Sequence, residues 1–174
     1  ISSSADDWEN YTLLMQAIRK AIGPDKLLTL ASQAGARFID FAAIEPVIDF
    51  VNIMTYDMGR PPAHHAPLYQ SYLTRGLSVD EAVAAHVKAG IPLNKLTMGM
   101  PFYGHGKEYL PDFIDYKDIM NLSGYEWKWD DQAQAPYATN GKGILVCTYD
   151  DPRSIALKCN YIIEKGMLGE IGRA

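Results

Sequence analysis

Residues 49–57 read DFVNIMTYD, an apolar run that ends in a tyrosine and an aspartate. The run predicts a strand over residues 50–56, and two further apolar runs flank it, LLTLA at 27–31 and LTMGM at 96–100. The LLTLA run shows no alternation of apolar and polar residues, so we expect that strand to be buried on both faces. These three runs decide the fold class.

Helical patterns lie between and beside the predicted strands. Apolar residues recur at helical spacing over residues 11–22 and predict a first helix. An S-x-x-E capping box at Ser78 predicts the start of a second helix. A third helix is predicted to begin after Asp151 and to end at Gly166. The start of a further strand follows at residues 167–168. Alternating helices and strands predict parallel βα units in an α/β fold.

The alternation of predicted helices and strands stops after Gly104. Up to about Cys147 the chain is rich in aromatic, aspartate and turn residues, which indicates an inserted small α+β lobe. We therefore divide the chain into βα units over residues 1–103, the insertion lobe over 104–148, and a last helix with the start of a strand over 149–174.

Composition excludes several classes of protein. Of the 174 residues 48% are hydrophobic and 21% are charged, which is typical of a globular domain. The net charge of -5 disfavours a nucleic-acid partner, and no apolar run is long enough to cross a membrane. The cysteines Cys147 and Cys159 are expected to be buried free thiols, with a disulfide bridge as the less favoured alternative.

Three stretches in register resemble the family 18 glycoside hydrolases. They are DFVNIMTYD at 49–57, IPLNKLTMGMPFYG at 91–104 and YDDPRSIALKCNYIIEKGMLG at 149–169, and WDDQAQAPY at 129–137 is similar to part of the family's insertion. The resemblance implies a partial (β/α)8 TIM barrel, with strands five to seven, the start of strand eight, and a small α+β insertion after strand seven. The family's D-x-x-D-x-D-x-E signature, which carries the catalytic glutamate, does not occur in the 174 residues.

The resemblance also implies a reaction. In such enzymes the substrate's N-acetyl oxygen attacks the anomeric carbon while the glutamic acid protonates the leaving oxygen. Tyr56 would place the acetamido group, Asp57 would hydrogen-bond the sugar beside the acid, and Met54 would wall the pocket. From the residues alone, the favoured interpretation is an ordinary strand end in which Tyr56 and Asp57 satisfy loop backbone groups, and the resemblance to the family reverses that preference.

Further sugar contacts are expected from Tyr103, Gln33, Asp130, Trp127 and Trp129. Aromatic rings stack on sugar faces, but core packing of Tyr103 and structural packing of the tryptophans explain these residues equally well.

A metal site is not expected. His64 and His65 are adjacent and point in different directions, and no carboxylate or cysteine stands at ligand spacing from them. No phosphate loop or dinucleotide fingerprint occurs in the sequence either, so no cofactor is expected. His105 stands where the family often has an arginine.

The sequence thus predicts a fragment of a chitinase-type glycosidase that acts on chitin or N-acetylglucosamine oligosaccharides. A non-catalytic, chitinase-like amino-sugar-binding or remnant module is the alternative. Without the glutamate, the chain alone is expected to be inactive. The resemblance implies a secreted, periplasmic or cell-surface protein, and the exposed sheet of a partial barrel implies pairing with a copy of itself or with the rest of the barrel.

Overall fold

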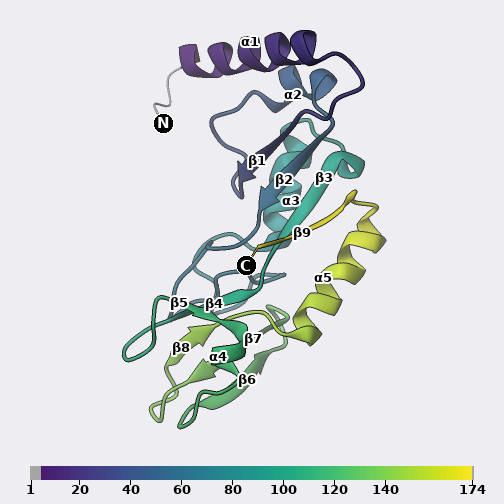
Figure 1. Ribbon diagram of the computed structural model, residues 1–174. Coiled ribbons are helices and arrows are strands. Elements are labelled where there is room, and N and C mark those ends of the chain that lie inside the picture. The colour runs from purple at the N-terminus through teal and green to yellow at the C-terminus, as the bar shows by residue number, and fades with distance from the viewer. Residues whose placement is uncertain (1–4, 174) are drawn as a thin grey trace.

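A computed structural model describes residues 5–173, so residues 1–4 of the expected first region and Ala174 lie outside the described residues. Figure 1 shows a parallel sheet with helices in the upper part of the molecule and an antiparallel sheet in the lower part. The helical elements are α1 (Ala5–Ile22), α2 (Phe41–Ile44), η1 (Glu45–Val47), α3 (Val79–Lys88), η2 (Leu93–Lys95), α4 (Tyr116–Ile119) and α5 (Pro152–Lys165).

The upper sheet has four parallel strands in the order β1-β2-β3-β9. They are β1 (Thr29–Gln33), β2 (Phe50–Met54), β3 (Leu96–Pro101) and β9 (Gly169–Arg173). The strands predicted at 50–56 and 96–100 are confirmed within two residues. The last strand starts at Gly169 rather than at residue 167, and all five of its residues pair with β3.

Local signals fix the helices that were predicted from sequence. Ser78 and Glu81 form a reciprocal capping box at the start of α3, and Asp151 does the same with Ser154 at α5. Gly166 ends α5 with a φ of 69°, a left-handed conformation that glycine adopts at low cost. Helix α3 lies between the parallel neighbours β2 and β3, and α5 leads from the last strand of the lower sheet, β8 (Leu145–Thr148), into the parallel strand β9.

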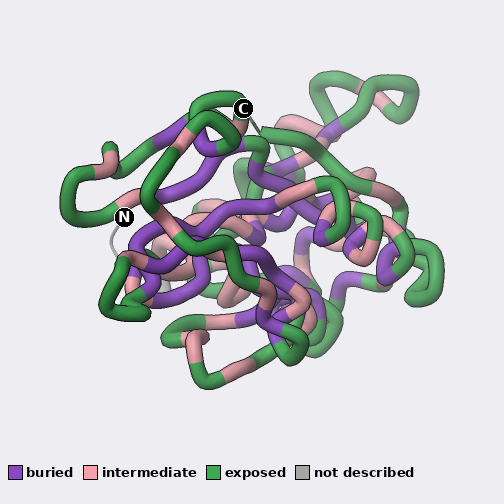
Figure 2. Tube along the Cα trace, turned by 90° about the horizontal axis from the view of Figure 1, so that it is seen from below, coloured by how far each residue is buried: buried purple, intermediate pink, exposed green. Residues whose placement is uncertain are grey.

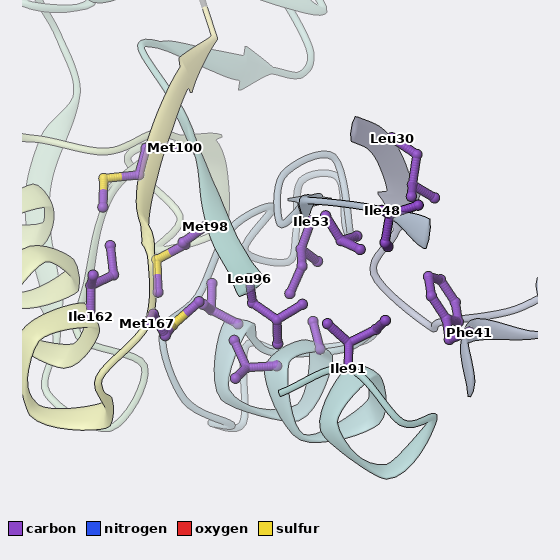
Figure 3. Close-up of a cluster of buried hydrophobic side chains, with 14 of the residues drawn as sticks. Leu30, Phe41, Ile48, Ile53, Ile91, Leu96, Met98, Met100, Ile162 and Met167 are labelled. Carbon is purple, nitrogen blue, oxygen red and sulfur yellow. The ribbon is translucent and has the colours of Figure 1, made fainter. Parts of the chain in front are cut away.

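The main core lies between one face of the parallel sheet and the helices. Alternate strand residues point into it, among them Leu30, Ile53, Leu96 and Met98, and each is at most 9% exposed. Figure 3 shows these side chains meeting Phe41, Ile91, Ile162 and Met167. We call this the covered face of the sheet.

The opposite face, which we call the open face, carries Ala31, Gln33, Asn52, Met54 and Ile171, all exposed or half-buried. The expectation that the 27–31 strand is buried on both faces is therefore wrong. Leu27 lies before β1 and is 73% exposed, and β1 is an edge strand that buries only its helix-facing residues. Figure 2 shows the same mixture of buried and exposed segments along the chain.

The lower sheet is antiparallel, in the order β5-β4-β8-β7-β6. Its strands are β4 (Tyr103–Gly106), β5 (Phe113–Asp115), β6 (Glu126–Asp130), β7 (Ala135–Thr139) and β8 (Leu145–Thr148). Ile114, Ile119, Ala138, Cys147 and Tyr149 form its own small core. A sheet with the short helix α4 fits the composition of the expected lobe, whose status as a separate domain stays a prediction.

The two cysteines are free, Cys147 buried and Cys159 only partly buried. A buried ion pair between Lys158 of α5 and Asp150 joins the last helix to the chain that leaves the lower sheet. None of the described helices is long and apolar enough to cross a membrane.

Candidate active site

The candidate site begins where β2 ends. Thr55 donates a hydrogen bond of 2.7 Å to the carbonyl of Gly99 on β3, which anchors the start of the loop to the neighbouring strand. Asp57 follows with a φ of 58°, a left-handed conformation that a non-glycine residue adopts at a cost. Such strain is common at functional sites, where surrounding contacts hold the residue in place.

Three side chains hold the Asp57 carboxylate. The Tyr103 hydroxyl donates to Oδ1 at 2.6 Å, Nε2 of His105 lies 2.8 Å from the same oxygen, and Nη1 of Arg173 donates to Oδ2 at 3.0 Å. Burial raises the pKa of Asp57, but the side chains of His65, Tyr103 and His105 outweigh it and hold that pKa well below its usual range. Asp57 is therefore an ionised hydrogen-bond acceptor.

Two histidines stand behind this carboxylate. His65 is fully buried, and its Nδ1 lies 3.8 Å from Oδ1 of Asp57. Burial lowers the pKa of His65 to about 4, against the opposing effect of Asp57. The ring of His65 meets that of His105 edge to face, with 4.9 Å between centroids.

A cavity of about 390 Å³ opens at this end of the sheet. It is lined by Gln33, Ala34, Gly35, Arg37, Met54, Tyr56, Asp57, Met58, Leu77 and Arg173. The structure thus brings together four of the sequence-predicted site residues, Gln33, Met54, Tyr56 and Asp57, at the carboxyl ends of β1 and β2. Ligand sites of parallel sheets lie at these ends.

A glycine positions Tyr56. A Cβ on Gly99 would lie 2.7 Å from Cε1 of Tyr56, so only glycine lets this ring rest against β3. The same ring meets the guanidinium of Arg173, whose Cζ is 4.7 Å from the ring centroid. Tyr56 is therefore positioned by contacts with β3 and with a cation from β9.

Tyr103 is near the cavity but is not among its lining residues. It is 6% exposed, and burial and then its bond to Asp57 raise the pKa of its hydroxyl well above the usual range. The hydroxyl is already engaged with Asp57, so the contact that the structure gives Tyr103 is to the carboxylate.

The predicted site residues of the insertion lie elsewhere. Asp130 is buried and accepts hydrogen bonds from the backbone of Gln132 and Ala133, with Nε2 of His64 3.1 Å away. Trp129 lies under the guanidinium of Arg153, 3.7 Å from Cζ. Trp127 lines a separate cavity of about 240 Å³, shared with Tyr116, Met120, Tyr149, Asp151 and Pro152. The structure does not bring these three residues to the Asp57 cavity.

Sequence reasoning missed His65, His105 and Arg173 as partners of Asp57. His105 directly follows the strand-end segment PFYG, which was a usable signal, because residues at such ends face the site. His65 opens the segment HAPLY, which is similar to the family's loop after this strand and was a further usable signal. Arg173 carried no comparable signal, since it lies 116 residues from Asp57 in the chain.

The parallel sheet, with its ionisable cluster at the strand ends, defines an α/β protein of the kind that binds ligands at that edge. The profile of the glycosyl hydrolases family 18 matches residues 2–171. Chitinase A1 of Niallia circulans is 33% identical over 97% of this chain and 31% of its own length. The chain therefore belongs to the glycosyl hydrolases family 18.

Solved structures agree with this assignment. A family 18 N-acetylglucosaminidase from Paenibacillus barengoltzii superposes with a TM-score of 0.85 at 28% identity, over 99% of this chain and 60% of that protein. A cell-surface-expressed multi-modular chitinase from Paenibacillus has a TM-score of 0.80 at 29% identity, over 96% of this chain and 23% of that protein. The chain spans less than two thirds of each of these three relatives.

Proposed function

We propose that this chain is part of a chitinase-type glycosidase that hydrolyses β-1,4-linked N-acetylglucosamine polymers by substrate-assisted, retaining catalysis. The observation that carries the proposal is the cavity of about 390 Å³ in which Tyr56, Asp57, Met54 and Gln33 meet at the strand ends. Relatives named as chitinases and an N-acetylglucosaminidase support the substrate class. Export to the cell surface or beyond belongs to the same proposal and is supported by the cell-surface relative.

The fold part of the proposal is that β1, β2, β3 and β9 are strands five to eight of a (β/α)8 barrel. All four are parallel, and their open face holds residues that a closed barrel would bury. Residues 1–103 and 149–174 would then be barrel units, and residues 104–148 the insertion lobe. In this arrangement the cavity lies at the catalytic end of the barrel.

The proposed chemistry divides the work between two side chains. The Tyr56 hydroxyl donates to the acetamido group of the bound sugar and places its oxygen for attack on the anomeric carbon. The ionised Asp57 accepts a hydrogen bond from the sugar and stabilises the positive charge that develops nearby. Because Tyr103, His105 and Arg173 hold the carboxylate, its position needs little reorganisation during the reaction.

Remaining contacts extend the proposed sugar-binding surface. Met54 and Gln33 line the cavity and would contact the sugar at the cleavage point. Tyr103 would act there through Asp57. Trp127 is 43% exposed, lines its own cavity, and would contact sugar units farther along the chain of the substrate. Weaker contacts of the same kind are proposed for Trp129 and Asp130.

The first test is turnover by the 174-residue chain. Its sequence lacks the D-x-x-D-x-D-x-E glutamate, and general acid catalysis typically contributes a factor of about 10²–10⁴. We expect no measurable release of chromophore from a chromogenic chitobioside, with the mass of the chain confirmed. Turnover near that of ordinary glycosidases would overturn the expectation of inactivity.

The second test uses a longer protein that includes this chain and a D-x-x-D-x-D-x-E strand. Tyr56→Phe and Asp57→Asn should lower kcat more than they raise KM, because both contacts tighten as charge develops at the anomeric carbon. Tyr109→Phe is the matched control, since Tyr109 is 95% exposed. Unchanged turnover in both site variants would show that Tyr56 and Asp57 take no part in catalysis and serve only the structure.

A non-catalytic amino-sugar-binding module is the second candidate, favoured by the missing glutamate motif. The discriminating measurement is binding of N-acetylglucosamine oligosaccharides to the chain in calorimetry. The same measurement is made on a longer protein that includes this chain and the D-x-x-D-x-D-x-E strand. If that protein binds the oligosaccharides but does not hydrolyse them, the binding module is supported over the enzyme.

Association belongs to the proposal as well. The edge strands β1 and β9 and the open face would stabilise contact with a second copy or with the rest of a barrel, at about 25 cal/mol per Å² of apolar area removed from water. Light scattering at micromolar concentration should give a mass above the 19.4 kDa of one chain. A well-folded monomer would contradict it.

A further inference from the structure

Asp57, His65 and His105 come from three separate segments, and one ligand atom from each lies within 4.8 Å of the others. Asp57 follows β2, His65 lies in the loop before α3, and His105 lies on β4. Both histidines are fully buried, while the aspartate side chain is 25% exposed. We infer that these three side chains form a binding site for a divalent transition-metal ion of the zinc class.

The hydrogen bonds of His105 fix the direction of its ring. Its Nδ1 lies 2.7 Å from the carbonyl oxygen of Asp112, which can only accept, so Nδ1 carries a proton. Its Nε2 lies 2.8 Å from a carboxylate oxygen of Asp57, also an acceptor. Its Nε2 is thus aimed at a carboxylate oxygen, and the 2.8 Å between the two atoms would lengthen to about 3.3 Å around a tetrahedral ion.

The Asp112 carbonyl accepts a ring N–H of His105, as hydrogen-bond partners outside the ligand set do in metal sites. A histidine that binds a metal almost always donates its other ring N–H to a carboxylate or a backbone carbonyl, which fixes the tautomer and the direction of the ring. His105 is already oriented in this way, with Nε2 aimed at Asp57.

His65 supplies the second, independent observation. Neither of its ring nitrogens has a hydrogen-bond partner among the described residues, although the side chain is only 1% exposed. Buried polar atoms without a partner are rare in folded proteins, and a bound ion is one explanation for them. The 3.8 Å between Nδ1 of His65 and Oδ1 of Asp57 is too long for a hydrogen bond, and it would shorten by about 0.5 Å if both atoms bound one tetrahedral ion.

The surroundings select the type of cation. Two imidazoles and one carboxylate suit zinc, cobalt, nickel or copper, whereas calcium and magnesium take oxygen ligands. Arg173 bonds Oδ2 of Asp57, and its 44% exposed side chain can stay on that oxygen or swing away. On Oδ1 the cation would replace the hydrogen bond from His105 and would lie beside the Tyr103 hydroxyl, 2.6 Å from that oxygen, and Nη1 of Arg60, 3.9 Å from it. Water reaching the exposed side of Asp57 would complete the coordination.

A cation at this site is no part of the proposed function, but it would affect sugar binding. A cation on Oδ1 would occupy the carboxylate that the proposed function assigns to the sugar, so cation and sugar would compete. Binding of the cation is measured on the chain itself, without any assay of hydrolysis, and its failure would leave the proposed function untouched.

The experiment is a titration of the chelator-treated 174-residue chain with Zn²⁺ in calorimetry and with Co²⁺ in visible spectroscopy. We expect saturation at one ion per chain, an intense Co²⁺ ligand-field band, and no competition from excess Mg²⁺. His105→Gln and Asp57→Asn should weaken binding by at least about tenfold. His86→Gln is the matched control, because His86 is an equally buried histidine that bonds Ser32 and Ala82 instead.

X-ray absorption of the Zn²⁺-loaded wild-type chain keeps the inference testable if a variant does not fold. The inference predicts scattering from two imidazoles. Absence of saturable binding, a spectrum without imidazole scattering, or equal affinity in folded His105→Gln and Asp57→Asn would overturn it.

Discussion

The two faces of the parallel sheet have different roles, although they are formed by the same strands. On the covered face, Leu30, Ile53 and Met98 are nearly inaccessible and pack against helices. On the open face, Gln33 and Met54 are exposed or half-buried and lead to the Asp57 cluster at the strand ends. Because side chains alternate along a strand, one residue contributes to stability and the next to the site.

The largest expected effect separates two adjacent residues of β2. Ile53→Ala on the covered face should lower the free energy of unfolding by roughly 2–5 kcal/mol, since it leaves a cavity in a fully buried site. Met54→Ala on the open face is the matched control and should cost clearly less in urea unfolding. Equal losses would show that the open face is covered in solution.

A polar contact within the covered face gives the next effect. His86 of α3 has Nε2 2.8 Å from Oγ of Ser32 on β1, and His86→Gln should cost about 1–3 kcal/mol by leaving buried groups unpaired. Urea unfolding at neutral pH measures this loss.

His86 also predicts a pH dependence. Burial lowers its pKa in the fold, so as pH falls below 6.5 the unfolded chain takes up the proton first. The stabilisation by neutral His86 is therefore complete above pH 6.5 and is lost as pH falls towards the folded pKa. Urea unfolding from pH 7.5 to 5 should show a flatter curve for His86→Gln than for the wild type; parallel curves would contradict the prediction.

Gly99 tests the contact of Tyr56 with the open face. Gly99→Ala places a methyl group 2.7 Å from the Tyr56 ring and 2.6 Å from the carbonyl of Ile53, so we expect a loss of about 1–3 kcal/mol. A displaced Tyr56 ring should be visible in a crystal structure or in its NMR signals. Gly141→Ala is the control, because an added methyl there meets nothing within 4 Å.

The smallest expected effect is that of Arg173→Ala. The pair with Asp57 is partly exposed, so its loss should change unfolding by no more than about 1 kcal/mol, and by less at high salt. A loss of several kcal/mol would mean that the open face stabilises the fold as the covered face does.

The sequence by itself determined the α/β class, the order of the three longest helices and, within two residues, the strands of the parallel sheet. Those features follow from local patterns, such as the capping boxes at Ser78 and Asp151 and the apolar runs of β2 and β3. It also pointed to Tyr56 and Asp57 as residues at a strand end, where parallel sheets place their sites.

Only the tertiary structure decided which residues meet at Asp57. His65, His105 and Arg173 reach it from a loop, a second sheet and the last strand, and no sequence spacing encodes such distances. The same limit explains why the burial expected for residues 27–31 was wrong: an apolar run shows that a strand is buried somewhere, but its neighbours in space decide which faces are covered. Local physics sets the elements, and packing between distant elements sets the site.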